Sequence, residues 1–167
     1  MEYESLFTSA IEVGIGIAGF SGIVAVLGHR SPGAWTSADR GRMGILLQTS
    51  FATVLLSFLP LLLSGVIVEK TLVWSVCSGV YAAYTMTSVV VRWPKIQELR
   101  KDPANKVDDV YVRIIICGLA IAVVLQIVNI AWLHTGWPYA ASVLWTMTVA
   151  FTQFVRLMRV LWKSRTS

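Results

Sequence analysis

The stretch VRIIICGLAIAVVLQIVNIAWL, from Val112 to Leu133, contains a single charged residue, Arg113, near its start. As a helix it is long enough to cross the hydrocarbon core of a bilayer, which is about 30 Å thick. Four further segments have a similar length and apolar character: Leu6–Leu27, Gly44–Val68, Leu72–Val91 and Tyr139–Trp162. The sequence therefore predicts an all-α membrane protein with five transmembrane helices in a single domain, residues 1–167.

Lysine and arginine are concentrated in or beside alternate gaps between these segments. The N-terminal tail and the gap His134–Pro138 have none, and the gap Glu69–Thr71 has only Lys70. The other gaps and the C-terminal end hold the remaining basic residues: Arg30, Arg40, Arg42, Arg92, Lys95, Arg100, Lys101, Lys106, Arg113, Arg156, Arg159, Lys163 and Arg165. Because basic loops stay in the cytoplasm, we expect the N-terminus outside and the C-terminus inside. The basic residues behind the net charge of +5 are then explained by the orientation of the chain in the membrane, and no nucleic-acid partner is expected.

The gaps on the basic side carry turn and cap signals. Ser31-Pro32-Gly33 predicts a turn, and Thr36 or Ser37 is a candidate helix cap. Pro94 is expected to begin a short helix, Pro94–Lys101, which Asp102-Pro103 stops. Asn105 can then cap the next helix.

The first segment contains a stripe of small residues. Gly14, Ala18 and Gly22 follow one another at four-residue spacing, which places them on one helix face where another backbone can approach closely. Gly14–Gly19 also spells G-x-G-x-x-G, but the dinucleotide-binding motif requires a strand before the glycines, and here they lie inside an apolar helix. The stripe predicts helix packing, either within one chain or between the copies of a homo-oligomer.

The run Ile17-Ala18-Gly19-Phe20-Ser21-Gly22-Ile23, preceded by the acidic Glu12, resembles the first helix of a group of small uncharacterised bacterial integral-membrane proteins. The resemblance covers this short stretch and implies no activity. It implies a multi-pass protein of the bacterial inner (plasma) membrane.

Glu12 is the one carboxylate well inside a predicted span. An ionisable group in a membrane is expensive and marks a functional site by default. Four polar residues on other segments are expected at a similar depth: Ser78, Gln126, Asn129 and Thr146. This layer predicts a path for an ion or small solute. The alternative is a structural Glu12 near the outer interface, solvated or neutral.

No catalytic constellation occurs in the sequence, and an enzymatic role has no support. Cys77 and Cys117 are expected at different depths, both buried, without metal-ligand spacing, so neither metal nor cofactor is predicted. The leading hypothesis is a small homo-oligomeric channel or transporter for an ion or small solute. The alternative is a non-transporting membrane scaffold or accessory subunit, with a cytoplasmic partner at Arg92–Val112.

Overall fold

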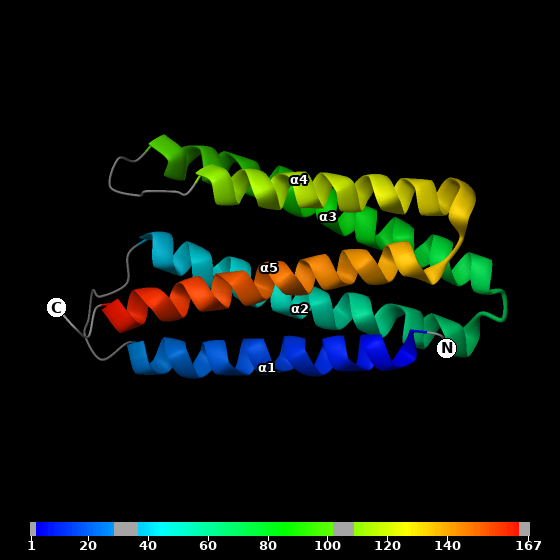
Figure 1. Cartoon of the computed structure of the whole chain (residues 1–167), viewed down its shortest axis with the longest axis horizontal. Coiled ribbons are helices and arrows are strands. Elements are labelled where there is room, and N and C mark those ends of the chain that lie inside the picture. Colours follow the sequence, from blue (N-terminus) through cyan, green and yellow to red (C-terminus); the bar gives the residue numbers. More distant parts are fainter. Residues whose placement is uncertain (1–2, 29–36, 102–108, 164–167) are drawn as a thin grey trace. The chain divides into compact units, whose positions relative to one another are not determined.

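The computed structural model describes residues 3–28, 37–101 and 109–163. Their elements are listed in chain order: α1 (Glu4–Gly28), α2 (Ser37–Val66), α3 (Lys70–Lys101), α4 (Asp109–Val128), the π-helix η1 (Asn129–Leu133) and α5 (Gly136–Lys163) (Figure 1). Within these ranges the chain contains no strand, so the predicted all-α class is confirmed. Each predicted apolar segment corresponds to one helix, with α4 and η1 together forming the fourth.

Three helices are long enough and apolar enough to cross a membrane, through the stretches Glu4–Val24, Arg40–Val66 and Val110–Leu133. On α4, Ile121 and Val124 are 61% and 57% exposed. A water-soluble chain does not usually leave so much contiguous apolar surface uncovered. Cys117 lies on this exposed face, so the expectation that it is buried is wrong, whereas Cys77 is fully buried.

The chain divides into two compact units. The hairpin unit comprises Met1–Glu4 and Leu59–Ser142, and the three-helix unit comprises Ser5–Phe58 and Val143–Ser167. In the hairpin unit, α3 packs against α4 and η1. In the three-helix unit, side chains of α1, α2 and α5 form one apolar core, made of Ile17, Met43, Leu46, Ala150 and Leu157.

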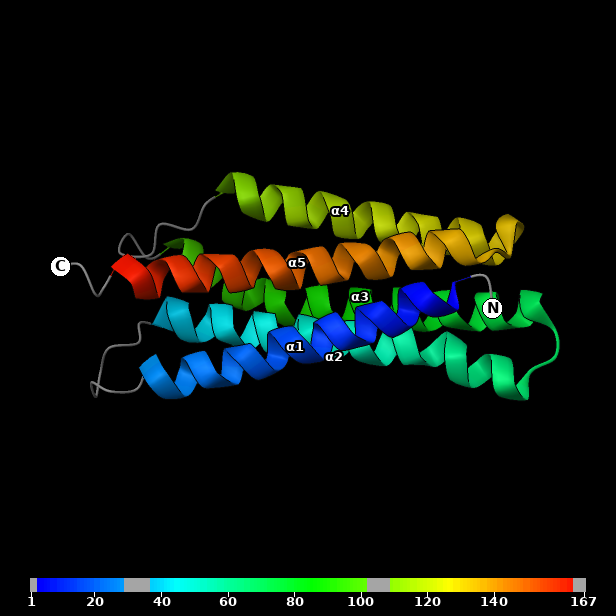
Figure 2. The same ribbon diagram turned by 60° about the horizontal axis from the view of Figure 1, so that its bottom comes forward.

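Within the three-helix unit, α1 lies along α2 (Figure 2) and approaches it closely at Gly14. A Cβ atom at Gly14 would lie 2.8 Å from Val54 Cγ2 and 3.2 Å from the Ser50 carbonyl oxygen. Of the other small residues in the predicted stripe, Ala18 is half-buried and Gly22 is exposed, with open space around its Cβ position. The contact with α2 therefore depends on Gly14.

The expected separate helix Pro94–Lys101 is wrong, because α3 runs unbroken through Pro94 to Lys101. Proline lacks a backbone donor and its ring crowds the carbonyl four residues earlier, but a long helix can continue past both costs. The expected turn at Ser31–Gly33, the stop at Asp102-Pro103 and the cap at Asn105 lie outside the described residues. The helix α2 begins at Ser37, one of the two candidate cap positions.

We expect Gly14→Ala to lower the free energy of unfolding by about 1–3 kcal/mol, because the added methyl group overlaps Val54. Gly22→Ala is the matched control on the same helix. It meets open space and should leave stability unchanged or raise it by up to about 1 kcal/mol. Unfolding followed by circular dichroism in mixed micelles measures both, and equal effects would contradict the role of Gly14.

Candidate functional site

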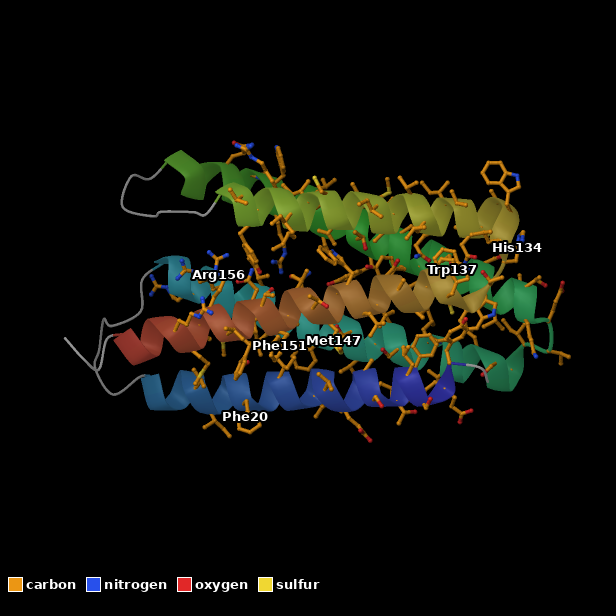
Figure 3. All side chains as sticks on the ribbon, viewed as in Figure 1. Phe20, His134, Trp137, Met147, Phe151 and Arg156 are labelled. Atoms are coloured by element: carbon orange, nitrogen blue, oxygen red, sulfur yellow. The ribbon has the colours of Figure 1, made fainter. Side chains whose placement is uncertain are left out.

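The connection from α4 to α5 is made by a short π-helix and a tight turn. The amide of His134 donates a hydrogen bond to the carbonyl oxygen of Asn129 at 2.9 Å, the five-residue spacing of a π-helix. His134, which Figure 3 labels at the end of the helix, then adopts a left-handed backbone conformation with φ of 49°. This conformation is unfavourable for a residue with a Cβ atom, so neighbouring interactions must stabilise it.

The carboxamide of Asn129 supplies those interactions. Its Oδ1 accepts a hydrogen bond from the Thr135 amide at 3.0 Å, and its Nδ2 donates to the Thr135 carbonyl oxygen, also at 3.0 Å. The same Nδ2 donates to Ser78 Oγ on α3 at 2.8 Å. Asn129 is fully buried. One side chain thus closes the turn and ties it to α3.

One helical turn earlier on α4, Gln126 binds the beginning of α5. Its Nε2 donates to the Pro138 carbonyl oxygen at 3.1 Å and to Ser142 Oγ at 2.7 Å. The Ser142 hydroxyl in turn donates to Pro138 at 2.9 Å. Gln126 is also fully buried, and its Oε1 has no hydrogen-bond partner among the described residues. The amide donors of Gln126 are therefore used within the protein.

Aromatic side chains pack beside this polar cluster. The Tyr81 hydroxyl donates to the Ser142 carbonyl oxygen at 2.9 Å. The ring centroids of Tyr81 and Tyr139 lie 6.1 Å apart, and those of Tyr139 and Trp74 lie 6.4 Å apart. Tyr3 contacts Trp74 edge to face, at 6.2 Å. Gly136 makes room for this packing, because a Cβ atom there would lie 2.7 Å from ring carbons of both Trp74 and Tyr3.

The structure brings together three of the five residues predicted to line a path. Ser78 and Asn129 are in contact, and Gln126 lies one turn from Asn129 on the same helix, all within the hairpin unit. Glu12 and Thr146 belong to the three-helix unit, where Glu12 is exposed on α1 and Thr146 is buried on α5.

The partners of Gln126 and Asn129 on the far side of the turn are not predicted from the sequence. Thr135 and Pro138 contribute backbone groups to the cluster, and Ser142 contributes its hydroxyl. The sequence does carry one signal for them. Two amide side chains three residues apart lie on one helix face, directly before a short connection, and the following helix must fold back past that face.

The groups that meet at this cluster are amides, hydroxyls and backbone carbonyls, and most of their donors are used in bonds to one another. Their chemistry is suited to holding the hairpin together and not to acid–base catalysis. Among the described residues, no three His, Cys, Asp or Glu side chains gather as a metal site would require. No family model, curated protein or solved structure matches this chain.

We expect Asn129→Ala to lower the free energy of unfolding by about 1–2 kcal/mol, because it removes the hydrogen-bond partner of the partly buried Thr135 amide and of Ser78. Ser78→Ala removes one hydrogen-bond partner of Asn129 and should cost about 1 kcal/mol or less. In the Asn129→Ala background, Ser78→Ala should have almost no further effect, since their shared bond is already absent. Denaturant titration in micelles measures all four chains, and strictly additive losses would argue against the contact.

Proposed function

We propose that the chain is a small homo-oligomeric membrane channel or transporter that moves an ion or small solute past Glu12. It crosses the inner membrane five times, with the N-terminus outside and the C-terminus inside. The observation that carries the proposal is the exposure of Glu12 on α1, one of the helices apolar enough to cross a membrane.

The arrangement of the hairpin unit supports five spans. The contact between Ser78 and Asn129 places the apolar part of α3 beside the apolar stretch Val110–Leu133. Because α3 and α4 are packed side by side, a bilayer that surrounds α4 would also surround the apolar part of α3. The bonds from Gln126 to Pro138 and Ser142 hold the first two turns of α5 against α4, within the hairpin unit. On this proposal α1, α2 and α5 also cross, which makes five crossings with the termini on opposite sides.

Glu12 lies about 12 Å along α1 from its first residue, at about 1.5 Å per residue. Lipid is an unfavourable neighbour for a carboxylate at that depth, so water or another protein surface should cover it. Gly16 and Gly19 follow at four- and seven-residue spacing on the same exposed side, and no atom lies within 4 Å of their Cβ positions. Such a face allows a second copy to approach closely, and the path then runs where the copies meet.

Phe20 marks the edge of this face. It is 64% exposed and points away from α2 and α5 (Figure 3). A large aromatic side chain beside small residues gives the surface a ridge and a groove, which is the shape that interlocking helices use.

The hydrogen bonding of the hairpin unit favours the second candidate, a non-transporting scaffold or accessory subunit. Gln126 and Asn129 direct their amide donors to protein groups, as in a rigid structural element. In that case the segment Arg92–Val112 is the surface for a cytoplasmic partner. Ion flux separates the two candidates.

The orientation is tested by labelling single cysteines introduced at Ser5 and Ser167, in a chain whose Cys77 and Cys117 are replaced by alanine. In intact cells a membrane-impermeant maleimide should label position 5 only, because the basic segments hold the C-terminus inside. Labelling of both positions from outside would exclude an odd number of spans.

Glu12→Gln should reduce cation flux into liposomes by at least about tenfold while leaving the protein folded, since the amide keeps the shape but loses the charge. Glu4→Gln, at the start of the same helix, is the matched control and should retain wild-type flux. Equal flux through wild type and Glu12→Gln would remove Glu12 from the mechanism. Absence of flux in every preparation would favour the scaffold.

A further inference from the structure

The helix α2 carries a row of three hydroxyl side chains, Ser50, Thr53 and Ser57, all fully buried. Their spacing of three and four residues places them on one face of the helix. Met43 and Leu46 lie on the same face, and both contribute to the apolar core that α2 forms with α1 and α5. The row therefore points into the three-helix unit.

Two of these hydroxyls lack a hydrogen-bond partner. Serine and threonine inside a helix often donate to the carbonyl oxygen four residues earlier, as Ser21 and Thr53 do at 2.6 Å and 2.9 Å. The Oγ atoms of Ser50 and Ser57 make no such bond, nor any other bond within the part of the chain that the structure describes. A buried hydroxyl without a partner is unfavourable, and binding a small hydrogen-bonding molecule relieves that penalty.

The spacing within the row suits one bridging water on either side of Thr53. Side chains three or four residues apart on a helix have Cβ atoms about 5–6 Å apart. Two O–H···O hydrogen bonds in series, each about 2.7–2.8 Å long, span about the same distance. The Thr53 hydroxyl donates to the Thr49 carbonyl oxygen, so its own oxygen can accept a bond from a water on each side. Each water can also accept a bond from one of the two unpaired serines.

The row occupies the middle of an apolar helix. Thr53 is the central residue of the stretch Arg40–Val66, about 20 Å along the helix from either end. The helix α1 covers part of the row, because a Cβ atom at Gly14 would lie 3.2 Å from the Ser50 carbonyl oxygen and 3.7 Å from Thr53 Cβ. One turn before Ser50, Leu46 is fully buried in the apolar core. The row is therefore an enclosed site, and the core closes one end of it.

We propose that Ser50, Thr53 and Ser57 bind two water molecules inside the three-helix unit, one between each neighbouring pair of hydroxyls. Each water then bonds two hydroxyls, within the two to four bonds that a buried water typically makes. The row consists of neutral groups, which favours a neutral ligand over an ion in so buried a place. This site is separate from the exposed Glu12 and is independent of transport.

Thiol exchange in single-cysteine variants provides the first test. Ser50→Cys and Ser57→Cys are made in a full-length chain whose Cys77 and Cys117 are replaced by alanine. The protein in phosphatidylcholine nanodiscs is transferred to heavy water, and the S–H infrared band is followed as S–D replaces it. Because bound water carries deuterium to the thiol, we expect exchange at both positions to be at least about tenfold faster than in the control Ser21→Cys.

The control is matched in burial but not in bonding. Ser21 is also fully buried in the three-helix unit, and its hydroxyl donates to its own helix. It lies nearer the end of its apolar stretch, Glu4–Val24, so proximity to the surface alone would favour exchange at position 21. Exchange at position 50 or 57 that is no faster than in this control would overturn the proposal.

Alanine variants provide a second test that needs no thiol. Removing a hydroxyl that is bonded to water, by Ser50→Ala or Ser57→Ala, should lower the thermal midpoint by about 2–4 °C, whereas removing an unpaired buried hydroxyl should raise it. Combining Ser50→Ala with Thr53→Val should cost less than the sum of the two, since each change alone already removes the water that they share. A raised midpoint, or strictly additive losses, would contradict the bridging waters. Neither test depends on flux, so a failure of transport through Glu12 leaves both results interpretable.

Discussion

The geometry of the hairpin unit depends on the side chain of Asn129. Its carboxamide forms two hydrogen bonds with the backbone of the turn, as a neighbouring backbone segment would. The carboxamide of Asn129 bonds both the amide and the carbonyl of Thr135, and Gln126 binds the carbonyl of Pro138 one turn further on. A backbone group that is withdrawn from water without a partner costs about 1–3 kcal/mol. Because these amides satisfy the turn from within, the chain can reverse between η1 and α5 in two residues, His134 and Thr135.

The tightness of that reversal sets the packing beside it. A short connection places Gly136 directly against the rings of Trp74 and Tyr3, where no side chain would fit. It also presents the first turns of α5 to α3, so that Tyr81 reaches the Ser142 carbonyl oxygen and packs against Tyr139. Polar bonds at the turn and aromatic packing next to it thus stabilise the same geometry.

The sequence predicts the helices well because length and apolarity belong to each segment separately. It also predicts that Ser78 and Asn129 lie at similar depth, as their contact requires. Depth alone does not determine which face a residue occupies. Glu12 and Gly14 are about 200° apart around α1, and so one is exposed while the other meets α2. The predicted helix start at Pro94 is wrong because proline is a local signal, and α3 continues through it to Lys101.

The stripe Gly14, Ala18 and Gly22 predicts one packing face on α1, used either within one chain or between copies. The structure shows two different faces on this helix. At Gly14 the helix is already in contact with α2, and a second copy cannot occupy that position as well. In the homo-oligomer that we propose, close contact between copies through α1 would use the opposite side, where Glu12, Gly16 and Gly19 are exposed. An interface on this side would remove Glu12 from lipid, which a lone chain in a bilayer does not achieve. In the function that we propose, assembly and a path along Glu12 would therefore be linked, because the surface that joins the copies would be the surface that carries the charge.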